Sequence, residues 1–186
     1  MAKHSLVAIV EDKPGVLNRV ASLFRRRGFN IDSIAVGHSE TVGLSRMTIV
    51  VDGTATSVEQ VRKQLDKLID VVRVTDISED NLVARELALL KVKATPATRS
   101  EIIQIVDIFR ANIVDVAADS MMVEVTGDDD KIDSLFRLLK GFGIQEIART
   151  GRIAMARGAG GPIVVEERPR RARPKRVKGA DEISNL

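Results

Sequence analysis

The sequence of 186 residues contains no cysteine, no tryptophan, no tyrosine and only two histidines. Without cysteine the chain forms no disulfide and offers no thiolate nucleophile and no cysteine-ligated zinc or iron–sulfur site. The two histidines, His4 and His38, exclude a three-histidine metal site and leave little choice for a catalytic triad. Five phenylalanines are too few for the stacking surfaces of single-strand nucleic-acid binders. Catalysis by this chain alone is therefore not favoured.

Long apolar runs are also absent. No stretch approaches the ~20 apolar residues that a membrane-spanning helix needs, and the first residues lack the apolar core and cleavage site of a signal peptide. Apolar residues make up 44% and charged residues 30% of the chain, close to the average of soluble proteins. These features predict a folded cytoplasmic protein of one ordinary domain or two small ones, without a membrane segment.

The net charge of +3 is concentrated at one end of the sequence. Residues 158–186 hold seven basic and four acidic side chains, so this segment accounts for the whole excess. It is rich in glycine, proline and arginine and poor in large apolar residues, which predicts a disordered basic tail. The preceding part is neutral overall, and its charge says little about what it binds.

The first half of the chain alternates between two hydrophobic periods. Apolar residues at every second position predict strands over 3–10, 29–36, 44–51 and 71–77, and 3–10 is apolar on both faces. A period near 3.6 predicts helices over 16–27 and from 57 to 68. Asp12 is a plausible N-cap of the first helix, and Gly28 is placed to end it. The resulting order is βαββαβ.

After a polar break at 78–81 the same order recurs, with strands expected over 86–94, 113–117, 121–126 and 144–148 and helices over 102–109 and 132–139. We therefore predict an α+β fold of two tandem ferredoxin-like modules, over 1–78 and 82–157, followed by the tail 158–186. Each sheet carries its helices on one face. The other face needs a cover, either a second module or a second subunit, and a homodimer is the interpretation that we favour.

Most clusters of functional side chains have a structural explanation. Asp128, Asp129 and Asp130 resemble a metal cluster, but they precede a helix, where acidic residues cap amides. His38 falls in the expected turn 37–43 without an obvious partner. The three arginines 25–27 suit the last turn of a helix, and no phosphate-binding glycine motif follows a strand, so a nucleotide site is not supported.

The segment that joins the first strand to the first helix is more informative. Free amides at a helix N-terminus bind carboxylates, and Gly15 has no side chain to keep an anion away from them. Asn30, which opens the next strand, can accept from an ammonium group and donate to a carboxylate. Nearby apolar residues could form a slot for an aliphatic side chain; these are Val16, Leu17 and Ile31. The competing interpretation is a plain strand-to-helix turn.

Residues 12–17, Asp-Lys-Pro-Gly-Val-Leu, resemble the D-x-P-G-x-L signature of ACT domains, βαββαβ modules that bind amino acids at dimer interfaces. Residues 23–33 and 44–49 resemble the small regulatory subunit of acetolactate (acetohydroxyacid) synthase, as do 63–68, 85–89 and 109–116. The resemblance runs from about His4 to Arg157. It implies an N-terminal ACT domain, an ACT-like C-terminal domain and no chemistry in this chain.

In that family the large catalytic subunit carries thiamine diphosphate, magnesium and FAD and condenses pyruvate with pyruvate or 2-oxobutyrate. The resemblance implies that this chain carries no cofactor, activates that partner and confers feedback inhibition, usually by valine. The effector residues implied are Asp12, Gly15, Val16, Leu17, Asn30 and Ile31. Valine, leucine and isoleucine stay open as effectors, because one methylene in an apolar slot is worth only about 1–3 kcal/mol.

The alternative function is a free-standing tandem ACT regulator that senses an amino acid and acts on transcription or metabolism. Its basic tail could contact a few phosphates, but basic residues there alternate with proline and acids, and no recognition helix is visible. Nucleic-acid binding is therefore not favoured.

Overall fold

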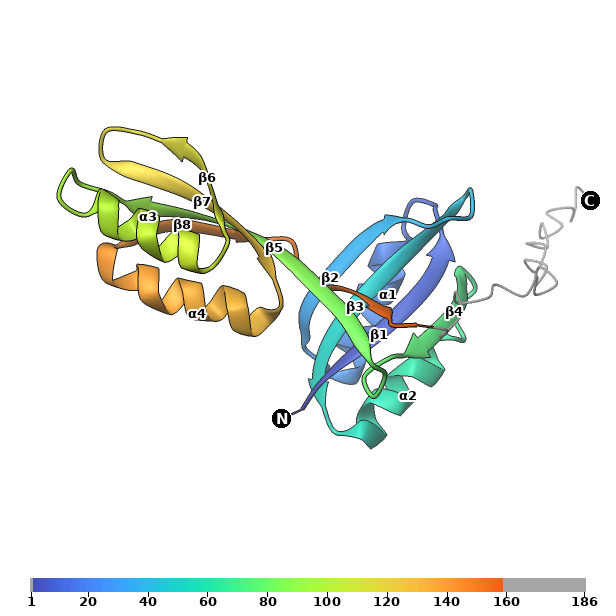
Figure 1. The fold of residues 1–186 in the computed structure, drawn as a ribbon. Coiled ribbons are helices and arrows are strands. Elements are labelled where there is room, and N and C mark those ends of the chain that lie inside the picture. Colours follow the sequence, from blue (N-terminus) through green and yellow to red (C-terminus); the bar gives the residue numbers. More distant parts are fainter. Residues whose placement is uncertain (1, 159–186) are drawn as a thin grey trace, which may run out of the picture.

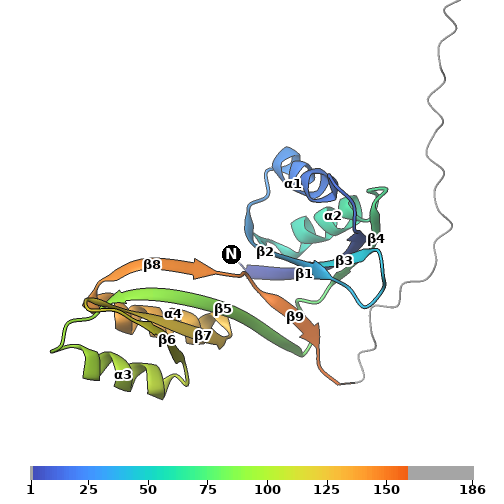
Figure 2. The same ribbon diagram turned by 90° about the horizontal axis from the view of Figure 1, so that it is seen from above.

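The structure, a computed structural model, describes residues 2–158; the expected tail lies outside the described residues from 159 onward. The N-terminal module is an antiparallel sheet with strand order β2-β3-β1-β4, and helices α1 and α2 cover one of its faces (Figures 1 and 2). In chain order its elements are β1 (Ala2–Glu11), α1 (Val16–Arg27), β2 (Ile31–His38), β3 (Leu44–Gly53), α2 (Ala55–Leu65) and β4 (Val71–Asp76).

The C-terminal module repeats this plan with strand order β6-β7-β5-β8 and two helices on one face (Figure 1). Its elements are β5 (Leu82–Lys93), α3 (Arg99–Ile108), β6 (Asn112–Val116), β7 (Ser120–Gly127), α4 (Asp129–Leu139), a short 3-10 helix (Lys140–Phe142), β8 (Ile144–Arg149) and β9 (Ile153–Ala156). The predicted α+β fold with two ferredoxin-like modules is confirmed.

Each module has its own apolar core between sheet and helices. In the N-terminal module Phe24 of α1 and Leu65 of α2 pack on Leu6 and Ile49 of the central strands. In the C-terminal module Ile102 and Leu135 are the corresponding helix residues, and no residue belongs to both cores. The helical stripes predicted from the sequence thus pack on two separate sheets, one in each module.

One strand was missed. β9 (Ile153–Ala156) pairs with the first four residues of β5, which begins at Leu82 rather than at the expected residue 86. This two-stranded ladder lies across the N-terminal sheet on the face opposite α1 and α2 (Figure 2). There Ala154 of β9 packs with Val7 of β1 and Ile77, all nearly inaccessible to solvent. The segment was missed because its four residues, Ile-Ala-Met-Ala, are all apolar and show no alternating period.

The cover of β1 is therefore provided by the same chain. Both faces of this strand are buried, as predicted, and Leu6 to Val10 are each at most 1% exposed. Of the two covers expected from the sequence, the second module is the one observed on this face. A homodimer consequently needs a different surface from the one that first suggested it.

Candidate functional site

The N-terminus of α1 has no side-chain cap. Its N-cap residue is Gly15, with φ 86° and ψ −7°, and the first turn contains no acidic residue. The left-handed conformation explains glycine at this position, because other residues adopt it at a cost. The first amides of a helix have no acceptor within the helix, and Val16 N–H has only a long bond of 3.4 Å to Lys13 O. Backbone donors therefore gather here.

Asp12 is not the N-cap, contrary to the sequence prediction. It lies three residues before Gly15; its N–H donates to Gly43 O at 2.9 Å, and its carboxylate is 3.5 Å from Nδ1 of His38 at the end of β2. The sequence predicts no partner for His38, but its ring lies beside Asp12, although the His38 side chain is 88% exposed. These contacts attach the loop before α1 to the β2–β3 turn.

Arg19 is a site residue that sequence reasoning missed. Its Nη1 is 3.9 Å from the place where a Cβ on Gly15 would stand, so a cation adjoins the amides of the first turn. Its Nε is 2.5 Å from Oδ2 of the buried Asp70, which holds the guanidinium in position. The spacing of four residues from Gly15 was a visible signal for Arg19. Asp70 gave none, because it follows in the sequence only after 50 further residues.

The expected apolar slot does not form within one chain. Val16 is 3% exposed and belongs to the N-terminal core, so only its backbone faces the site. Ile31 is half-buried and packs against the same core. Leu17, in contrast, is 49% exposed on α1. Of the three apolar residues predicted to form the slot, Leu17 is therefore the one whose side chain is most available to an apolar ligand group.

Asn30 is also separated from Gly15 within one chain. Gly15 precedes α1 and Asn30 follows it, and a helix of 12 residues is about 18 Å long. Asn30 is exposed at the start of β2, which is an edge strand of the N-terminal sheet. The sequence prediction thus names two exposed groups at opposite ends of the same helix.

The remaining clusters have the structural roles expected of them. Asp128 caps α4 by accepting from Lys131 N–H at 2.9 Å, while Asp129 and Asp130 lie in the first turn. The three arginines 25–27 are exposed in the last turn of α1, which Gly28 ends with φ 70°. Within residues 2–158 no group of three or more potential ligands is placed to hold a metal ion. No helix over the same residues is long and apolar enough to cross a membrane.

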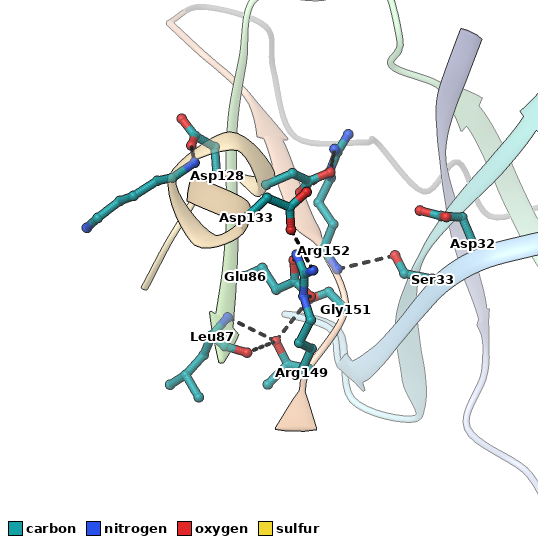
Figure 3. A network of polar contacts seen from close by, with 12 residues as sticks. Asp32, Ser33, Glu86, Leu87, Asp128, Asp133, Arg149, Gly151 and Arg152 are labelled. Carbon is teal, nitrogen blue, oxygen red and sulfur yellow. Dashed lines mark hydrogen bonds and ion pairs between the residues drawn. The ribbon is translucent and has the colours of Figure 1, made fainter. Parts of the chain in front are cut away.

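Next to the junction of the modules, Arg149 of β8 bridges two elements of the C-terminal module (Figure 3). Its guanidinium lies 2.7 Å from the buried Glu86 of β5 and 2.9 Å from Asp133 of α4. Hydrogen bonding to Glu86 raises the pKa of Arg149 above its ordinary value. This arginine links β8 to β5 and α4 within the C-terminal module.

Arg152 makes several of the polar contacts between the modules (Figure 3). Its side chain pairs with Asp129 of α4 and reaches Ser5 Oγ of β1 at 3.4 Å, while its backbone N–H donates to Ser33 Oγ at 3.4 Å. The preceding Gly151 has φ 81°, and a Cβ there would stand 3.3 Å from Ile34 O. Glycine thus permits the close approach of the two modules at this point.

Comparison with known proteins decides the family. Residues 6–73 match the model of the acetohydroxyacid synthase small subunit-like ACT domain, and residues 85–158 match that of the small subunit of acetolactate synthase. The chain belongs to the acetolactate synthase small-subunit family. The ACT-domain match contains the uncapped start of α1, Arg19 and Asn30.

Relatives in this family match nearly their whole length. The probable acetolactate synthase small subunit of Archaeoglobus fulgidus is 56% identical over 156 residues, 84% of this chain and 98% of that protein. The acetolactate synthase small subunit of Bacillus subtilis is 53% identical over 157 residues, 84% of this chain and 91% of that protein. The crystal structure of the Thermotoga maritima small subunit superposes with a TM-score of 0.79 at 46% identity, covering 85% of this chain and 99% of that one.

Proposed function

We propose that this chain is the regulatory subunit of an acetolactate synthase: it activates a thiamine-diphosphate-dependent catalytic subunit and mediates its inhibition by valine or another branched-chain amino acid. The observation that carries the proposal is the uncapped N-terminus of α1, with Arg19 beside it, inside the region that matches the ACT domain. Membership of the acetolactate synthase small-subunit family supports a catalytic subunit as the partner of this chain. The chain itself supplies no chemistry.

The chemistry of the site suits an α-amino acid. The carboxylate binds the amides that follow Gly15, with Arg19 as the neighbouring cation. Asp12 offers an acceptor for the ammonium group, and Leu17 offers apolar surface for an aliphatic side chain. Each charged group of the ligand thus meets a group of opposite charge, and its aliphatic side chain meets apolar surface, within one loop and one helical turn.

Asn30 joins this site if two copies pair along β2. This strand is at the edge of its sheet, and a two-fold antiparallel pairing centred on it sets Ile31 of one copy opposite the partner's His38. The partner's His38 is next to the partner's Asp12, so Asn30 then approaches the loop that begins α1. A homodimer along this edge therefore unites the residues that one chain keeps apart.

Inhibition follows if the effector binds one arrangement of the complex better than the other. A coupling free energy of about 1–3 kcal/mol is typical of such regulation. By reciprocity, the active arrangement weakens effector binding by the same factor.

Reconstitution tests this function. The purified chain is mixed with a catalytic subunit from the same source, and acetolactate formation is followed with and without valine, leucine and isoleucine. We expect no product from the chain alone, a higher rate from the mixture and inhibition by at least one of the three amino acids. Pyruvate turnover by the isolated chain, or a mixture that is neither faster nor inhibitable, would contradict the proposal.

The alternative, a free-standing tandem ACT regulator, also predicts amino-acid binding. It differs in predicting no effect on a catalytic subunit. The extent of the relatives' match, over both modules and nearly the full length of proteins named as small subunits, favours the regulatory subunit.

A further inference from the structure

A second concave surface lies on the opposite side of the N-terminal sheet from α1 and α2. The cavity measures about 760 Å³ and lies between β9 and the strands β2 and β3; we call it the β9 groove. Three apolar side chains that line it are about half exposed or more: Val36 at 49%, Ile153 at 59% and Met155 at 65%. Such a group of exposed large apolar side chains is unusual unless something covers it.

The groove is also cationic. Arg46, Arg85 and Arg157 line it, and each donates to a backbone carbonyl: Arg46 to Ala154 O at 2.8 Å, Arg85 to Ala84 O at 2.7 Å and Arg157 to Leu82 O at 3.0 Å. In the part of the chain that the structure describes, none of the three is ion-paired, and the groove lining includes no carboxylate. Burial lowers the pKa of Arg46, against a smaller opposing effect of Glu40. The groove thus suits an apolar segment that carries negative charge.

The chain itself offers such a segment a few residues further on. Gly158, the last described residue, lines the groove. After Ala-Gly-Gly-Pro at 159–162, the sequence continues with Ile163, Val164 and Val165 and then Glu166 and Glu167. We propose that residues 163–167 of the same chain dock in the β9 groove, with the aliphatic side chains on its apolar surface and the two glutamates against its arginines.

The length of the connection allows this. Four residues span at most about 13 Å, which is enough to turn back beside β9, and the Gly-Gly pair permits a reversal of the chain. Five extended residues cover about 17 Å, comparable with the four-residue strand that borders the groove. A segment tethered so closely has an effective concentration in the millimolar range, so weak contacts suffice for occupancy.

The segment lies outside the two modules that match the family models. The family model ends at residue 158, and the match to the Archaeoglobus fulgidus protein uses 98% of that protein but 84% of this chain. Docking of 163–167 is therefore a property that the shared modules alone do not provide. It does not depend on the proposed regulation of a catalytic subunit.

Engineered cysteines test the proposal directly, because the chain has none of its own. In the full-length chain, Val36→Cys is combined in separate variants with Val164→Cys and with Val165→Cys, whose side chains lie on opposite faces of an extended segment. The control combines Val36→Cys with Ser184→Cys. We expect at least one of the first two to form an intramolecular disulfide about tenfold faster than the control under mild oxidation. Equal rates in all three would overturn the proposal.

Hydrogen exchange gives a second measurement. Truncation after Gly158, and the triple variant I163S/V164S/V165S, should each raise amide exchange in Ile153–Ala156 about tenfold, whereas Arg170→Ser/Arg171→Ser should not. A peptide of residues 162–168 should restore protection to the truncated chain, and its E166Q/E167Q form should bind about tenfold more weakly. Protection of Ile153–Ala156 that instead follows protein concentration, and does not change when residues 159–186 are removed, would mean that a second copy occupies the groove and would overturn the proposal.

Discussion

The two modules share a fold but differ in what they leave open. At the first helix of the N-terminal module, the N-terminus is uncapped and adjoins a cation. In the C-terminal module α3, the counterpart of α1, also lacks a side-chain cap, but Glu101 places an acid in its first turn. Asp128 caps α4, and two further acids lie in the first turn of that helix. An occupied helix end cannot bind a second anion cheaply. Of these three helices only α1 has a first turn without an acid, so we expect the N-terminal module to bind an anionic ligand group.

The faces of the two sheets that point away from the helices differ in how far they are buried. On β1 the residues that face away from the helices, Val7 and Ile9, are fully buried beneath other parts of the chain. On β5 the corresponding residues include Leu89 and Lys91, which are only partly buried. The N-terminal module therefore depends on the second module for its cover, whereas the C-terminal sheet tolerates solvent through a mixed surface.

The largest effect is expected from Phe24→Ala, which tests whether the cores are separate. Phe24 is 1% exposed in the N-terminal core, and its truncation should lower the free energy of unfolding by about 4 kcal/mol. Hydrogen exchange should increase in β1, β3 and α2, with β7 and α4 largely unchanged. Equal loss of protection in both modules would show one cooperative unit instead of two.

Gly15→Asp should weaken effector binding, because it places a carboxylate where we propose that the ligand's own carboxylate binds. We expect valine affinity, measured by calorimetry, to fall at least about tenfold, or 1.4 kcal/mol. Gly15→Asn is the matched control, because both side chains pay a similar cost of about 1 kcal/mol for the positive φ and only one is charged. Unchanged affinity in both variants would make Gly15 a turn residue only.

Asp128→Ala tests the other side of the same comparison. Loss of the hydrogen bond to Lys131 N–H should cost about 1 kcal/mol of stability, measured by denaturant unfolding. Asp130→Ala, in the same first turn, removes a dipole-compatible charge without a capping bond and should cost about a third as much. Valine affinity should be unaffected by either change; a loss would place the effector in the C-terminal module.

The smallest effect concerns the surface of α2 and depends on pH. Hydrogen bonding to Arg62 lowers the pKa of Glu59 from 4.5 to about 2. A depressed folded-state pKa contributes stability above the unfolded value, and this is lost as the pH falls from 4.5 towards 2. Glu59→Gln should therefore lower the unfolding midpoint slightly at pH 7 and not at pH 2. An equal difference at both pH values would mean that the pair is not the cause.

Local sequence signals predicted local structure well. The alternation around Leu6, the helical stripe around Phe24 and the acids before Lys131 each describe contacts within one element or one turn, and the structure confirms them. The pairs Arg19–Asp70 and His38–Asp12 could not be predicted, because each joins residues whose proximity is set by the sheet order. Val16 shows a third case: the sequence predicts its side chain in the effector slot, but helix phase turns that side chain into the core.

The position of β9 at the end of the described chain has a consequence during synthesis. All strands of the N-terminal sheet have been made once residue 76 is added, whereas β9 is complete only at residue 156. At about 5–20 residues per second, Val7 and its neighbours remain without their final cover for several seconds after their own sheet can form. A nascent chain arrested in this interval should therefore bind chaperones through the face of β1 that β9 later hides.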